Sequence, residues 1–221
     1  MDVREMLNRA AWSFFIIVSA TLYGCGKSAA EKNPSAEKTE KAEQVKVVVP
    51  TICVYTLGEV KASLLNAMMD SLRAHYPKCE VAGNIPLPEG ARTTKRHDHV
   101  RYRADALNKV LGRYKTDTTV VIGLTQADIG LDNFRGREHS GIMGQASGIG
   151  TGVAVFSSYR PHGNGQLFSV SLHEIGHAQG LRHCPDEHCI MQDAKGGNPF
   201  SKTDTFCAKC KEFMRSKHWR L

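Results

Sequence analysis

HEIGHAQGLRHCPDEHCIM (residues 173–191) decides the fold expected of this chain. His173 and His177 are four positions apart, so on a helix both imidazoles lie on one face and can hold one metal ion. Gly180 favours the end of that helix, because glycine adopts the left-handed backbone conformation at low cost. The chain can turn back there, which makes His183 available as a third ligand.

Three neutral imidazoles leave one coordination position of zinc open, which is typical of catalytic zinc and not of structural zinc. Glu174 follows the first ligand directly, so it cannot easily share that ligand's direction, but it can face a water molecule and act as a general base. The motif therefore predicts a catalytic zinc held by His173, His177 and His183, with Glu174 as the catalytic base. A zinc site without catalysis remains an alternative, because the spacing specifies coordination and not turnover.

The cysteines beside this motif predict a second metal. Cys184 and Cys189 are followed by a C-x-x-C pair, Cys207 and Cys210, and four thiolates in two pairs suit a closed tetrahedral zinc site. The tail after residue 190 has few large apolar residues, so we expect the metal to supply order that its core lacks. Two disulfides are the alternative. His183 and Cys184 are adjacent, and we expect their side chains to diverge to two zinc ions, because only the histidine site needs an open position.

The whole pattern resembles the archaemetzincins, zinc metallopeptidases of the metzincin clan. Their signature joins HExxHxxGxxH to CxxxxCxM and then to a distant CxxC, and here Met191 fills the place of the methionine. The segments IPLPEGA, RYRADAL, VIGLTQADI and GVAVFSSYR also resemble the family, so the likeness spans most of residues 47–210.

The resemblance implies an α+β fold of metzincin type: a mixed β-sheet with packed helices, an active-site helix and a zinc-stapled C-terminal segment. It also implies two zinc ions per chain, and a Met-turn methionine, Met191, that packs beneath the catalytic metal without binding it. Two features depart from the family. Fifteen residues separate Met191 from Cys207, a short gap, and no tyrosine follows Met191 closely, so oxyanion stabilisation would fall to the metal, with Tyr159 or His162 as possible helpers.

The N-terminus is predicted to be an export signal of lipoprotein type, residues 1–24. Its apolar run, residues 10–23, is shorter than the about 20 residues that a membrane-spanning helix needs. The letters LYGC then resemble a lipobox in which Cys25 is the lipid anchor. An ordinary secretory signal, or the apolar start of a cytosolic chain, is the alternative. Residues 25–44, rich in Lys and Glu, are predicted to be a flexible tether.

Residues 45–221 are predicted to form the archaemetzincin-like domain, and the 41% of hydrophobic residues in the chain is ordinary for a globular protein. Composition and periodicity predict alternating strands and helices, followed by an irregular glycine-rich stretch at 130–152. Strands are expected at residues 44–58, 79–87, 118–125 and 152–159, and amphipathic helices at 59–77 and 98–115. The two remaining cysteines, Cys53 and Cys79, are equally compatible with a disulfide and with two free thiols.

We therefore expect a zinc-dependent metallopeptidase, a monomer that acts on peptides or proteins and is lipid-anchored to a bacterial envelope membrane. Whether it trims amino termini stays open; an aminopeptidase needs an acidic group for the substrate ammonium, and Asp128, Asp132 or Glu138 are candidates. The alternative is a non-catalytic zinc-binding envelope lipoprotein that uses the same scaffold to bind a partner. A pI of about 9.1 and the C-x-x-C pair are compatible with a nucleic-acid binder, but the export signal argues against nucleic acid as a partner.

Overall fold

The computed structural model describes residues 48–93, 99–134, 137–195 and 197–221, without the side chains of 132–139. The predicted export signal, the anchor Cys25 and the tether lie outside the described residues. Within the described part, no helix combines the length and the apolar character that crossing a bilayer requires.

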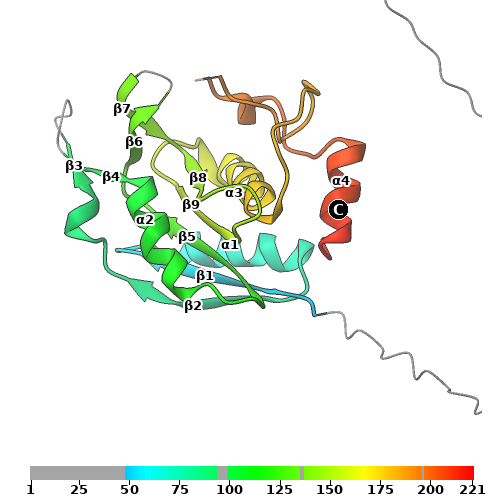
Figure 1. The fold of residues 1–221 in the computed structure, drawn as a ribbon, viewed down its shortest axis with the longest axis horizontal. Coiled ribbons are helices and arrows are strands. Elements are labelled where there is room, and N and C mark those ends of the chain that lie inside the picture. Colours follow the sequence, from blue (N-terminus) through cyan, green and yellow to red (C-terminus); the bar gives the residue numbers. More distant parts are fainter. Residues whose placement is uncertain (1–47, 94–98, 135–136, 196) are drawn as a thin grey trace, which may run out of the picture. The chain divides into compact units, whose positions relative to one another are not determined.

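The main sheet has five strands in the order β2-β1-β5-β9-β8 (Figure 1). Neighbouring strands from β2 to β9 run parallel, and β8 pairs antiparallel with β9 at one edge. The central strand β5 has the sequence TVVIGLT and is buried at six of its seven positions, as expected of a parallel strand covered on both faces. The predicted mixed sheet is confirmed. Its strands are β1 (Thr51–Leu57), β2 (Cys79–Ile85), β5 (Thr119–Thr125), β8 (Gly144–Ala146) and β9 (Val153–Ser157).

Helices cover both faces of this sheet and create two hydrophobic cores. Because side chains alternate along a strand, Ile52 and Val54 enter the core shared with α1 (Ala62–His75) and α3 (Gly163–Gln179). Leu57 enters the other core, which is shared with α2 (Ala104–Leu111). The predicted helices at 59–77 and 98–115 are thus both present, although the second begins later than expected.

A second sheet with the order β3-β4-β6-β7 was not anticipated. Its strands are β3 (Arg92–Thr93), β4 (Arg101–Arg103), β6 (Ile129–Phe134) and β7 (Arg137–Ile142). The helix expected from residue 98 was wrong over 101–103, because β4 pairs there with β3 and β6. The stretch 130–152, expected to be irregular, contains parts of β6, β7 and β8. Short 3-10 turns follow at Glu89–Ala91, Gly112–Tyr114 and Pro199–Ser201.

The strand register shows that Cys53 and Cys79 are both free. Cys79 is paired directly with Ile52, whereas Cys53 is paired with Glu80. Adjacent positions of a strand point to opposite faces, so one thiol packs against each of the two cores and no disulfide can join them.

The C-terminal tail contributes more to the core than its composition suggested. Phe206, Met214 and Trp219 are buried in the same core as α1 and α3, and α4 (Ala208–Ser216) carries the second of them. The indole Nε1 of Trp219 donates a hydrogen bond to Gln179 Oε1 at 2.6 Å. The expectation that only a metal would order this tail was therefore too narrow.

Candidate active site

Helix α3 carries the first three residues of the motif on its buried side. His173, Glu174 and His177 are all less than a tenth exposed. The helix ends as predicted at Gly180, whose φ of +119° is left-handed, and Leu181 N–H donates to Gly176 O at 2.8 Å. That turn reverses the chain and returns His183 toward the helix.

The two helical histidines have their tautomers set by backbone carbonyls. His173 Nδ1 lies 2.7 Å from Ile190 O, and His177 Nδ1 lies 2.8 Å from Leu181 O. Each neutral imidazole must therefore donate from Nδ1, which leaves a lone pair on Nε2. The two Nε2 atoms are 3.0 Å apart. Because neither of them carries a proton, this contact cannot be a hydrogen bond, and it has the geometry of two ligands that share a cation.

His183 completes a group of three. Its ring centroid lies 4.7 Å from that of His177 and 5.5 Å from that of His173, and the ligand nitrogens of the three residues lie within 4.8 Å of one another. Burial lowers the pKa of His173 to about 3 and also lowers the pKa of His177, so both remain neutral as metal ligation requires. Zinc–nitrogen bonds of about 2.0–2.1 Å are compatible with this spacing.

Glu174 is held beside the histidines by β8. Its carboxylate accepts a hydrogen bond from the backbone N–H of Ala146, and burial, which outweighs that bond, raises its pKa to about 8. A Cβ at Gly144 would lie 2.6 Å from Glu174 Cγ, so only glycine leaves room for the glutamate. The sequence alone did not identify Gly144 as a site residue. Its role depends on β8, a strand that could not be predicted within the glycine-rich stretch.

A cavity of about 950 Å³ contains the three histidines and Glu174. One wall is formed by β8, and Arg160, Arg182 and Asp193 also line it. Asp193 Oδ2 lies 4.0 Å from His183 Nδ1. The two residues that sequence reasoning offered as helpers to the oxyanion, Tyr159 and His162, are not among the lining residues.

Met191 lies beneath the active-site helix. It is fully buried, and its Sδ lies 2.7 Å from the position that a Cβ of Gly176 would occupy. Gly176 stands between the two helical histidines, so the thioether packs against the backbone that carries them. This contact is one of packing, as the resemblance implied.

The four cysteines form a second group. Their sulfur atoms lie within 4.8 Å of one another, and Cys184 Sγ is 3.8 Å from Cys207 Sγ. Two thiolates on a tetrahedral zinc, each at about 2.3 Å from the metal, are about 3.8 Å apart, whereas a disulfide requires about 2.05 Å. All four thiols are free, so the arrangement fits zinc and not two disulfides. His183 and Cys184 join different groups, although they are neighbours in the sequence.

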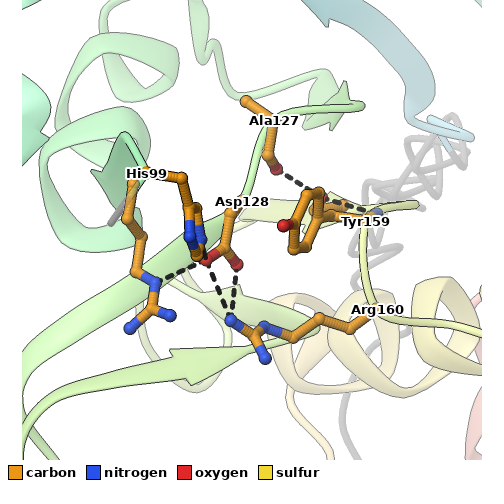
Figure 2. Close-up of polar contacts among 7 residues, drawn as sticks. His99, Ala127, Asp128, Tyr159 and Arg160 are labelled. Atoms are coloured by element: carbon orange, nitrogen blue, oxygen red, sulfur yellow. Dashed lines mark hydrogen bonds and ion pairs between the residues drawn. The ribbon is translucent and has the colours of Figure 1, made fainter. Parts of the chain in front are cut away.

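Asp128 does not suit the role of an ammonium-binding group. Its side chain is 1% exposed and is surrounded by cations, as Figure 2 shows. Asp128 Oδ2 accepts from Arg101 Nε at 2.6 Å and lies 2.8 Å from His99 Nε2. Arg160 Nη2 contacts both carboxylate oxygens, at 2.7 and 2.9 Å. The side chains of the other two candidates, Asp132 and Glu138, are outside the described residues.

The profile of Peptidase family M54 matches residues 80–216. The chain belongs to peptidase family M54. The archaemetzincin of Methanocaldococcus jannaschii is 24% identical over 183 residues, which cover 77% of this chain and 96% of the relative. The archaemetzincin of Haloarcula marismortui is 30% identical over 155 residues, which cover 62% and 83%.

Solved structures share the fold. The archaemetzincin of Methanopyrus kandleri superimposes with a TM-score of 0.63 at 24% identity and covers 79% of this chain and 98% of its own. A zinc-dependent peptidase of Methanocorpusculum labreanum gives a TM-score of 0.54 at 20% identity, with 73% and 98% covered. The expected family is confirmed, and the M54 chain described here is a zinc metallopeptidase.

Proposed function

We propose that this M54 chain hydrolyses peptide bonds at a zinc ion held by His173, His177 and His183, with Glu174 as general base. The observation that carries the proposal is the pair of Nε2 atoms 3.0 Å apart, both oriented by backbone carbonyls, in the cavity that contains Glu174. Buried, unprotonated imidazoles at this spacing suit a cation.

When bound, zinc polarises a carbonyl and lowers the pKa of water to about 7. The protein supplies the remaining steps. The Glu174 carboxylate takes the proton of the attacking water and then passes it to the leaving amine nitrogen. The backbone N–H of Ala146 orients the carboxylate for both transfers. Burial raises the pKa of Glu174, and a cation bound beside it would favour the ionised carboxylate that the proton transfer needs.

The edge strand β8 suits an extended peptide as substrate. It lines the cavity along its whole length, and its other side is already paired with β9. A peptide can add to such an edge through main-chain hydrogen bonds, which leaves the side chains to determine specificity.

An aminopeptidase mode requires a carboxylate for the substrate ammonium. Besides Glu174, the described acidic residue that lines the cavity is Asp193, so Asp193 is the candidate for this role. Comparing peptides that have free and acetylated amino termini tests it: cleavage of the acetylated peptides at equal rates would establish an endopeptidase.

We also propose a second, structural zinc on Cys184, Cys189, Cys207 and Cys210, which gives two zinc ions per chain. The 3.8 Å sulfur separation supports it. Elemental analysis of purified protein should return two zinc ions per chain. A value of one ion per chain would mean that only one of the two sites binds zinc.

The decisive experiment compares Glu174→Gln with the wild type. Glutamine keeps the size of the side chain but cannot accept the proton, so we expect kcat to fall about 10²–10⁴-fold. Zinc content should stay unchanged, since Glu174 is not a ligand. If zinc-loaded wild type cleaves no member of a diverse peptide library, the chain is instead a non-catalytic zinc-binding envelope protein.

We further propose that the chain is exported and anchored by a lipid on Cys25. The support is the sequence alone, the apolar run that ends in LYGC before a charged tether. Bacteria that express the gene should incorporate labelled fatty acid into the wild type and not into Cys25→Ala. Recovery of the wild type in the cytosolic fraction would contradict the proposal.

A further inference from the structure

Arg160 lies on the wall of the active-site cavity but outside the metal centre. It lies three positions after the end of β9, and its side chain is 33% exposed. Figure 2 shows its guanidinium beneath the Tyr159 ring and next to Asp128, and the Tyr159 centroid is 5.7 Å from Arg160 Cζ.

The backbone that carries Arg160 is fixed to the segment that carries Asp128. The Ser157 hydroxyl donates to Ala127 O at 2.6 Å and accepts from Tyr159 N–H at 3.0 Å. Together with the two contacts of Nη2 to Asp128, these bonds hold the guanidinium in one place before any substrate binds. A preorganised guanidinium loses less entropy when it forms hydrogen bonds.

Asp128 does not satisfy Arg160 completely. The same carboxylate also accepts from Arg101 and lies in contact with His99, so its charge is shared among several cationic or polar groups. Arg160 Nε is buried and has no hydrogen-bond partner among the described residues. A buried donor without an acceptor is costly, and the donors of an arginine match a carboxylate best.

The glycines along the cavity wall relate Arg160 to the reacting centre. A Cβ on Gly141 would collide with the guanidinium of Arg160, and a Cβ on Gly144 would collide with Glu174. Gly141 lies in β7 and Gly144 in β8, with a bend at Met143 between them, so at most about 10 Å separates them, the span of three residues of an extended peptide. Arg160 therefore lies within about three substrate residues of the bond that Glu174 would help to break.

We propose that Arg160 is a specificity residue that binds a substrate carboxylate about three residues from the scissile bond. The carboxylate belongs to an acidic side chain or to the C-terminus of a short peptide. The inference rests on the proposed peptidase function, because the distance in residues is counted from the bond that would be cleaved beside Glu174. The recognition itself can be measured without turnover.

Arg182 provides the matched control. It lines the same cavity and carries the same charge, but no carboxylate partner holds it among the described residues, and it is exposed. A general attraction of anions into the cavity would involve both arginines, whereas a built carboxylate site involves Arg160 alone.

The experiment measures peptide binding to zinc-loaded Glu174→Gln protein by fluorescence anisotropy. The probes are a peptide cut by the wild type, or an arbitrary acidic octapeptide if none is cut. Each probe is compared with versions in which one Glu is replaced by Gln, and with a C-terminal amide. We expect one such replacement to weaken binding at least about tenfold, since a charge-assisted contact to the guanidinium is lost. Which replacement it is identifies the carboxylate as a side chain or a C-terminus.

The same comparison in Arg160→Gln and Arg182→Gln, each in the Glu174→Gln background, assigns the effect. The preference for the acidic peptide should disappear in Arg160→Gln and persist in Arg182→Gln. Equal binding of all peptide pairs by the Glu174→Gln protein overturns the inference without any change at Arg160. Loss of the preference in Arg182→Gln but not in Arg160→Gln also overturns it. If the preference is present but the wild type cleaves nothing, the peptidase proposal fails while the carboxylate site stands.

Discussion

Among single residues, Asp128 illustrates how a buried charge links stability to pH. Burial alone would raise its pKa, but hydrogen bonds from His99 and Arg101 and the charges of Arg160 and Arg101 outweigh burial and hold the pKa below its usual range. The folded carboxylate therefore has a lower pKa than the unfolded one, which is about 3.9. Its contribution to stability is complete above that value and is lost as the pH falls through the folded pKa.

Asp128→Asn should lower the free energy of unfolding by about 3 kcal/mol at pH 7, because it removes the buried negative charge that Arg101 and Arg160 share. The difference between variant and wild type should begin to shrink below about pH 4, where the carboxyl group of the unfolded wild type protonates, and should vanish as the pH falls through the lower pKa of the folded state. Urea unfolding at pH 7, 5 and 3.5 measures both effects. A difference that stays constant down to pH 3.5 would show that the ionised carboxylate is not the source of the stability.

The three candidate ligands could be picked out from the sequence because they are close together along the chain. His173, Glu174 and His177 occupy one helical turn, and Gly180 brings His183 back over a few residues. Arg160 could not be found in this way. Its partners lie on other elements, and an ion pair between residues 32 positions apart leaves no periodic pattern in the sequence.

At the level of elements, α3 carries the glutamate and β8 fixes its position. Gly144→Ala would place a methyl group 2.6 Å from Glu174 Cγ and 3.1 Å from Oε1, so the glutamate would have to move away from β8. We expect kcat to fall about 100-fold, since a shift of about 1 Å in a catalytic group has that effect, while zinc content stays the same. Steady-state kinetics with parallel metal analysis measures it.

Gly165→Ala is the control for Gly144→Ala. Gly165 lies in α3 with nothing within 4 Å of its added Cβ, so alanine should stabilise the helix by about 0.5–1 kcal/mol and leave kcat unchanged. Full activity in Gly144→Ala would mean that β8 does not position the glutamate.

The helices and the strands rich in β-branched residues were predicted well, and the short or glycine-containing strands were not. The helix α1 has Leu72 and Met68 at helical spacing and was found in full. The strands β6 to β8 contain glycine at several positions, which lowers strand propensity, and β4 is only three residues long. β4, β6 and β7 are ordered by pairing with one another and β8 by pairing with β9, which one segment of sequence does not reveal.

In the molecule as a whole, two features are expected to stabilise the C-terminal tail: the group of four cysteines and the hydrophobic core. The tail buries Phe206, Met214 and Trp219 in the main core, so it has support that does not depend on metal. It also carries Met191, which packs under the active-site helix, and the backbone N–H of Cys184 donates to Met191 O at 2.8 Å. Loss of the proposed second zinc should therefore loosen the tail and disturb the active site without unfolding the main sheet.

Cys207→Ser tests this division, because it removes one of four thiolates from a site that needs all of them. Zinc content should fall from two ions per chain to one. Amide hydrogen exchange should accelerate over residues 184–217 and stay slow in β1 and β5, whose hydrogen bonds belong to the central sheet. Peptidase activity should also fall, since His183 loses the support of the chain that follows it.

Cys53→Ala is the control: it removes a free thiol on β1 and should keep both zinc ions. Uniformly fast exchange in Cys207→Ser would mean that the metal stabilises the entire domain. Unchanged exchange would mean that the apolar contacts alone are enough to order the tail.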